Sequence, residues 1–191
     1  MIPRYYSNLL AISAVQIVFI VGLSAGPRTN EQTETSKEFS DRVKQYLALQ
    51  KNAESALPSL EETDHPEKIE ARKVALAAAI RTARAGAKPG DIFGGAAEQF
   101  RGVIKDDSRQ RSARDASAAM QEVPKLAPAR VNASYPEKAA LATVPPLILK
   151  RLPPLPEGLE YRFMGRDLIL RDVKSNLIVD FIHEAVPTSG K

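Results

Sequence analysis

The sequence has 191 residues and no cysteine, with 27 lysine or arginine residues against 23 aspartate or glutamate residues. Without cysteine the chain can form neither a disulfide framework nor a lipoprotein anchor. The net charge of +4 is too small to indicate nucleic-acid binding, and we expect no nucleic-acid partner.

Residues 1–26 have the composition of an export signal. Arg4 and the amino terminus supply positive charge, residues 9–23 form an apolar run, and residues 24–26 are small enough for a cleavage site. An uncleaved membrane anchor is the alternative, but the apolar run is short for a span and is interrupted by polar residues. We therefore predict a cleaved signal and a periplasmic or secreted protein, which would touch a membrane only through an uncleaved signal.

Residues 35–122 are predicted to form a helical region after a flexible linker at 27–34, which is polar and lacks aromatic residues. Thr35 and Glu38 match a capping box, so the first helix is expected to begin near Thr35. Four apolar side chains then follow at helical spacing: Phe39, Val43, Tyr46 and Leu47. The helix ends at Pro58 at the latest.

A second helix is predicted to begin at residues 64–67, where an acidic cap precedes a proline and a glutamate. Its expected buried stripe consists of Ile69, Leu76, Ile80 and Ala83, and Gly86 is expected to end it. A third helical region is predicted over 94–122. That region has a first apolar patch around Phe100 and a thinner, alanine-rich patch after residue 112.

Residues 123–187 are predicted to form a proline-rich wrap followed by a C-terminal β-meander, in the same domain as the helices. Within the wrap, residues 129–135 are a candidate edge strand, and 145–151 are expected to form a short helix across the other face of the sheet. The predicted fold class is therefore α+β, with three or four helices packed on a small antiparallel meander.

The meander is expected to consist of three strands joined by two tight turns. Gly165-Arg166 fits a type II′ turn, which places Tyr161 opposite Leu170. Asp172 and Asn176 are suited to the second turn. The last strand, 177–182, is predicted to place Leu177, Val179 and Phe181 on one face and Ile178 and Ile182 on the other.

Most of the chain after the predicted signal, and its C-terminal end above all, resembles a family of bacterial secreted proteins of unknown function. The resemblance rests on Leu152-Pro-Pro-Leu-Pro156, Leu159-Glu-Tyr-Arg-Phe163, Gly165-Arg166, Leu168-Ile-Leu-Arg-Asp172 and Asn176-Leu-Ile-Val-Asp-Phe-Ile182, with further matches at Ala78–Arg84 and Gly90–Phe93. It implies export and a shared fold. It assigns no activity and no functional residue.

Catalytic candidates are few because the sequence contains only two histidines. His183 follows the last strand, and Asp180 precedes it by three residues. Residues three apart on a strand point to opposite faces, so these two side chains are not expected to pair. No metal-ligand spacing, phosphate-binding loop or nucleophile motif is present, and we expect no cofactor.

Arginines provide the second set of candidates. Arg81 and Arg84 lie on the second predicted helix, and Arg162 and Arg166 lie on the hairpin. Guanidinium groups suit carboxylate or phosphate ligands, so a shared anion site between helix and sheet is one interpretation. The other interpretation is that the hairpin arginines form salt bridges within the hairpin.

Three functions remain open at this level. The first is a non-enzymatic binding or structural module of the cell envelope, with a protein or polysaccharide partner. The second is an exported hydrolase whose site lies near the C-terminal meander and uses Asp180, His183 or the arginines. The third is a tethered module, if the signal is retained.

Overall fold

The computed structural model describes residues 28–59, 64–110, 128–136 and 142–187. Its elements are the helices α1 (Arg28–Ser55), α2 (Pro66–Ala83), α3 (Ala96–Gln110) and α5 (Pro146–Leu149), and the strands β1 (Ala142–Thr143), β2 (Leu159–Met164), β3 (Asp167–Asp172) and β4 (Leu177–Ile182). The predicted α+β fold is confirmed. The signal at 1–26 and the alanine-rich patch after residue 112 lie outside the described residues.

Helix α1 starts at Arg28, so the boundary between a linker at 27–34 and a helix from Thr35 was wrong. Between residues 28 and 34 the sequence contains neither glycine nor proline. Extending a formed helix adds one hydrogen bond per residue fixed, so these polar residues continue the helix toward the N-terminus. The buried face of α1 begins at Phe39.

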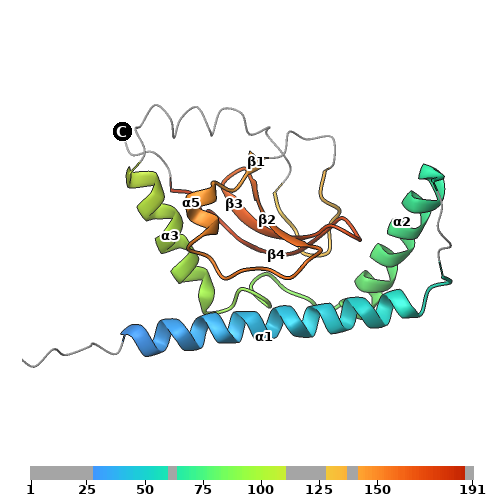
Figure 1. Ribbon diagram of the computed structural model, residues 1–191, viewed down its shortest axis with the longest axis horizontal. Helices are drawn as coiled ribbons and strands as arrows, with labels where there is room; N and C mark the ends of the chain where they lie inside the picture. The colour runs from blue at the N-terminus through green and yellow to red at the C-terminus, as the bar shows by residue number, and fades with distance from the viewer. Residues whose placement is uncertain (1–27, 60–63, 111–127, 137–141, 188–191) are drawn as a thin grey trace, which may run out of the picture.

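Helix α2 begins next to its predicted start, but its cap and its buried face differ from the prediction. His65 is the cap residue and makes no side-chain capping bond. Ile80 is buried as expected, whereas Ile69 is 49% exposed and Ala83 is exposed. Figure 1 shows the N-terminal end of α2 standing away from the sheet, which agrees with the exposure of Ile69. At the C-terminal end of α2, the side chain of Arg84 is buried, and that of Ala83 is not.

The sheet has strand order β1-β2-β3-β4 within the described residues, and all neighbours are antiparallel. The β2–β3 register is the predicted one, with Tyr161 opposite Leu170. Gly165 has a φ of 60°, as the first central residue of a type II′ turn requires. The two-residue strand β1 was not predicted. The predicted edge strand at 129–135 forms a single bridge, from Ser134 to Leu177.

Strand β4 contains a β-bulge that the sequence analysis missed. Asp180 pairs with Leu170 and Ile178 pairs with Arg171, so Val179 is the extra residue. A bulge shifts the alternation of side chains by one. Ile182 consequently packs in the helix-side core and Phe181 against the opposite face, which is the reverse of the predicted grouping.

The two faces of the sheet carry separate apolar clusters. The larger one joins the sheet to α1, α2, α3 and α5, and its centre includes stacked and edge-on aromatic rings of Phe39, Phe93, Phe100 and Tyr161. The smaller one contains Ala129, Tyr135, Met164, Ile169 and Ile178. Figure 1 shows α1 running along the sheet, with α3 and α5 at one end and α2 at the other.

The short helix α5 therefore lies on the same side of the sheet as α1 and α3, and its predicted position on the opposite face was wrong. Ile148 is 2% exposed and belongs to the helix-side cluster. The opposite face is covered instead by residues of the 129–135 segment. The backbone of this segment is hydrogen-bonded to Ile178 of β4 through Asn132 and Ala133, and to Asn176 just before β4 through Tyr135.

Candidate functional site

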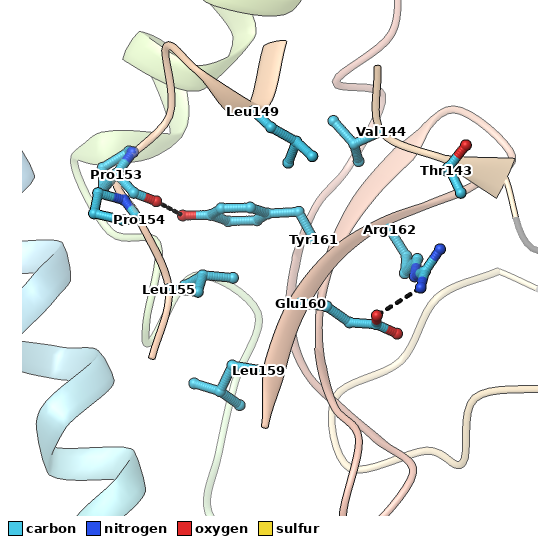
Figure 2. A pocket seen from close by; sticks show the side chains of 10 residues that line it. All are labelled: Thr143, Val144, Leu149, Pro153, Pro154, Leu155, Leu159, Glu160, Tyr161 and Arg162. Carbon is cyan, nitrogen blue, oxygen red and sulfur yellow. Dashed lines mark hydrogen bonds and ion pairs between the residues drawn. The ribbon is translucent and has the colours of Figure 1, made fainter. Parts of the chain in front are cut away.

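A pocket of about 350 Å³ lies where β2, α5 and the proline-rich segment meet, and we call it the β2-edge pocket. Its lining residues are Thr143, Val144, Leu149, Pro153, Pro154, Leu155, Leu159, Glu160, Tyr161 and Arg162. Figure 2 shows the apolar side chains gathered around the Tyr161 ring, with Glu160 and Arg162 together on one side. This volume lies within the usual range for small-molecule sites, and the mixture of apolar walls with a few polar groups is typical of them.

The apolar wall is built by the proline-rich stretch after α5. Consecutive prolines favour an extended chain, because the ring fixes φ and removes the amide donor. The Tyr161 hydroxyl donates to the Pro153 carbonyl oxygen at 3.0 Å, which fixes the stretch beside β2. Burial raises the pKa of Tyr161, so its hydroxyl stays protonated and remains a donor.

The polar end of the pocket consists of a carboxylate between two arginines. Glu160 accepts from Arg162 at 2.6 Å and from Arg171 at 2.8 Å. Desolvation alone would raise the pKa of Glu160, but the hydrogen bonds and charges of the two guanidinium groups outweigh it and lower that pKa. The same hydrogen bond to Glu160 raises the pKa of Arg162. Glu160 and Arg162 are therefore both charged at neutral pH.

Two buried polar atoms near this end have no hydrogen-bond partner in the part of the chain that the structure describes: the Nε of Arg162 and the hydroxyl of Tyr135. Tyr135 is 1% exposed, and burial raises the pKa of its hydroxyl. Nearly all buried polar groups in native proteins are hydrogen-bonded, so each exception indicates a missing acceptor or donor.

Asp180, a predicted catalytic candidate, is fully buried and engaged by backbone amides. One carboxylate oxygen accepts from Gly90 at 2.7 Å and from Phe181 at 2.8 Å, and the other accepts from Ile92 at 2.8 Å and Phe93 at 2.9 Å. A carboxylate so saturated has no lone pair directed at a substrate. Asp180 therefore has a structural role, because these hydrogen bonds hold the turn before α3 against β4.

His183, the other catalytic candidate, lies on the opposite side of the strand end from Asp180, in solvent. Its side chain is 70% exposed, and its Nδ1 lies 3.0 Å from Asp167. Asp167 also accepts from the Glu184 amide at 2.9 Å. His183 and Asp180 do not converge with Arg162, which lines the β2-edge pocket.

The predicted anion-binding arginines are divided among three places. Arg81 donates to Asn132 and Ser134, and Arg84 donates to Asn132 and Val179, so these two fix the 130–134 segment to α2. Arg166 donates to Val186 and Glu184 beyond the hairpin turn. Arg162 alone of the four lies at the β2-edge pocket.

Most of the pocket residues were not predicted from the sequence, because the walls of the pocket come from three separate segments of the chain. The signal that pointed toward it was the run of prolines and leucines at 152–156, which we used only for the family resemblance. The buried contact that joins α1 to the sheet was also missed. Here Asp172 accepts from the Tyr46 hydroxyl and from Gln50, both at 2.6 Å.

Within the described residues, no group of three or more histidine, cysteine or carboxylate side chains is placed to hold a metal ion. The same residues contain no helix whose length and apolar character would let it cross a bilayer. Comparison with protein-family models, with curated proteins and with solved structures found no match.

Proposed function

We propose that this chain is an exported, non-enzymatic binding module of the cell envelope, and that the β2-edge pocket is where it binds its ligand. One observation carries the proposal: an apolar pocket of about 350 Å³ with a charged group at one end. Such a site favours a ligand that has an apolar body and a polar group.

The positions of the catalytic candidates support binding over hydrolysis. A hydrolytic site needs a nucleophile, a base and a stabilising donor within hydrogen-bond reach of one another. In the described residues Asp180 is occupied by four amides, and the ring of His183 is hydrogen-bonded only to Asp167. Neither residue lines the pocket.

Export is the second part of the proposal and rests on the composition of residues 1–26. A periplasmic or extracellular module would meet envelope components that carry apolar groups, and an envelope protein or polysaccharide can present such a group. The chain needs no disulfide for this setting, because helices and sheet share one apolar cluster.

Binding at the pocket is tested with 1-octanol, a neutral apolar probe, added to the isotope-labelled protein lacking residues 1–26. We expect amide chemical-shift changes concentrated at residues 143–162. Leu149→Glu places a charge in the apolar wall and should abolish those changes. Leu147→Glu is the matched control, because Leu147 is on the same helix, is 61% exposed and does not line the pocket.

Two results would overturn the proposed site. One is the absence of any saturable shift change at residues 143–162. The other is a response that Leu149→Glu and Leu147→Glu weaken equally, because the probe would then be binding to the exposed side of α5 and not in the pocket.

A further inference from the structure

The short helix α5 exposes apolar side chains to solvent. Among the described residues, the large apolar side chains that are exposed are those of Ile69, Val74, Leu147, Leu149 and Val173. Two of them lie on this four-residue helix: Leu147 is 61% exposed and Leu149 is 44% exposed. Single exposed leucines are ordinary, whereas neighbouring ones mark a candidate interaction surface.

The backbone of α5 holds these two leucines outward. Ile148, which lies between them, is 2% exposed and packs in the helix-side core. Because successive residues of a helix are about 100° apart around its axis, an inward Ile148 places Leu147 and Leu149 on the two flanks of the helix. Proline in the first turn fixes the backbone there, and the Leu149 amide donates to the Pro145 carbonyl oxygen at 3.1 Å. A small local rearrangement therefore cannot bury both leucines.

The charges beside the leucines are mainly positive. From residue 142 to residue 156 the sequence has two basic residues, Lys150 and Arg151, and no acidic one. Helix α3 packs against α5 and adds one ion pair, in which Arg151 donates to Asp106 at 2.9 Å. Within the described residues, Lys150 and the exposed Lys105, which precedes Asp106, form no ion pair. The leucines are therefore bordered by positive charge that Asp106 does not neutralise.

An anionic bilayer surface fits this arrangement. Apolar side chains of peripheral proteins enter the boundary between headgroups and acyl chains, while lysine and arginine are attracted to anionic lipids. The stem of a lysine can also lie along apolar surface while its ammonium group reaches a headgroup. A protein partner fits less well. A stable protein interface covers about 800 Å² on each side and has an aromatic-rich centre, whereas α5 has four residues and no aromatic side chain.

We propose that Leu147, Leu149, Lys150 and Arg151 form a docking surface for a lipid bilayer that contains anionic lipid. The leucines enter the boundary of the acyl chains, and the two basic side chains bind headgroup phosphates. This contact differs from the one expected from the sequence, which was limited to an uncleaved signal. Because Leu149 is also a wall of the β2-edge pocket, docking would bring that pocket to the apolar part of the bilayer. The inference goes beyond the proposed function and does not require the pocket to hold a ligand.

Vesicle co-sedimentation tests the docking surface, with the chain lacking residues 1–26 so that the predicted signal cannot contribute. The probes are vesicles of phosphatidylcholine alone and vesicles with equal parts of phosphatidylcholine and phosphatidylglycerol. We expect roughly tenfold tighter binding to the anionic vesicles, and several-fold weaker binding to them after Lys150→Gln. No binding to either kind of vesicle overturns the proposal and leaves the leucines to a protein partner. Equal binding to both kinds overturns the role of the basic residues.

Charge substitutions assign the binding to α5. Leu147→Glu should weaken binding to the anionic vesicles roughly tenfold, because it removes an inserted apolar side chain. Val74→Glu is the matched control, since Val74 is 57% exposed and lies on α2, and it should leave binding unchanged. Equal weakening by the two substitutions overturns the assignment. Leu147→Glu should keep the response to 1-octanol described above, so a failure of docking is distinguishable from a failure of the pocket proposal.

Insertion of the leucines has a fluorescence test, because the chain contains no tryptophan. The emission of Leu147→Trp should shift to shorter wavelength when anionic vesicles are added, since the indole ring leaves water. Val74→Trp should show no such shift. An unshifted emission from vesicle-bound Leu147→Trp overturns the proposed insertion.

Discussion

Asp180 shows how backbone amides can hold a buried carboxyl group in place. Its two oxygens are saturated by amides of the 90–93 turn and of its own strand. Hydrogen bonds to a charged acceptor are the stronger kind, and their donors would be left unsatisfied if the acceptor were lost. Asp180, a catalytic candidate in the sequence analysis, therefore connects segments that are distant in the sequence.

Asp180→Asn should destabilise the fold by roughly 3 kcal/mol. The amide keeps one accepting oxygen, but its NH₂ group faces backbone donors that then have no acceptor. Urea unfolding followed by circular dichroism measures the change. Asp106→Asn is the matched control, since Asp106 makes an exposed ion pair with Arg151, and its change should stay within about 0.5 kcal/mol. Equal effects of the two substitutions would contradict this account.

Tyr46 and Asp172 make the buried hydrogen bond that fixes α1 to the sheet. Removing the hydroxyl in Tyr46→Phe should cost about 1.5–3 kcal/mol of unfolding free energy, as expected for a hydrogen bond to a charged group. A double-mutant cycle with Asp172→Asn isolates the pairwise part. A coupling energy close to zero would show that the two groups act independently.

Glu160 should make stability depend on pH in the acidic range. Because its folded-state pKa is lowered below the ordinary value of 4.5, its contribution is complete above that value and is lost as the pH falls through the folded-state pKa. The contribution should not exceed about 1 kcal/mol, because the pair is partly exposed. The stability difference between the native chain and Glu160→Gln, measured in urea, should therefore be largest above about pH 5 and shrink on acidification. A stability difference that does not change with pH would refute this role of Glu160.

At the scale of elements, the β2–β3 hairpin could be predicted from neighbouring residues in the sequence, whereas the bulge in β4 depends on tertiary contacts. Gly165 and the alternating apolar residues on either side of it were sufficient for the β2–β3 register, because both depend on neighbours in sequence. The bulge at Val179 could not be found in this way. It turns Asp180 toward the 90–93 amides, and those amides lie far away in the sequence.

The buried face of α2 gives a direct test of how this helix packs. Ile80→Ala removes a side chain that is 0% exposed and should cost about 2–5 kcal/mol of unfolding free energy. Ile69→Ala makes the same chemical change at a site that is 49% exposed, and we expect less than about 1 kcal/mol. Similar losses at both positions, measured by thermal or urea unfolding, would mean that the N-terminal turn of α2 is covered.

At the scale of the whole molecule, the fold class followed from the order of the predicted elements, whereas the site did not. Helical periodicity before residue 123 and alternation after residue 158 were enough to predict helices on a meander. The pocket needed three pieces of chain brought together by tertiary contacts. Arg162 was a candidate because of its residue type, and its unpartnered Nε became evident only from the packing around it.

The predicted export is tested by expressing the full chain in a bacterial host. We expect a soluble product in the periplasm or medium whose intact mass lacks about 25 residues. A full-length product in the membrane fraction would refute the cleaved signal and favour the tethered module.

The contacts that hold the helices in place have a consequence for the order of events during synthesis. Tyr46 and Asp172 are 126 residues apart, and Ile92 and Asp180 are 88 apart. Until β4 has left the ribosome, the 90–93 amides lack their acceptor and the aromatic rings of α1 and α3 lack much of their sheet. Contacts of this range form late and slowly. The helices therefore cannot complete their packing until β3 and β4 have been synthesised and have paired, so the burial of the helix-side core comes late in folding.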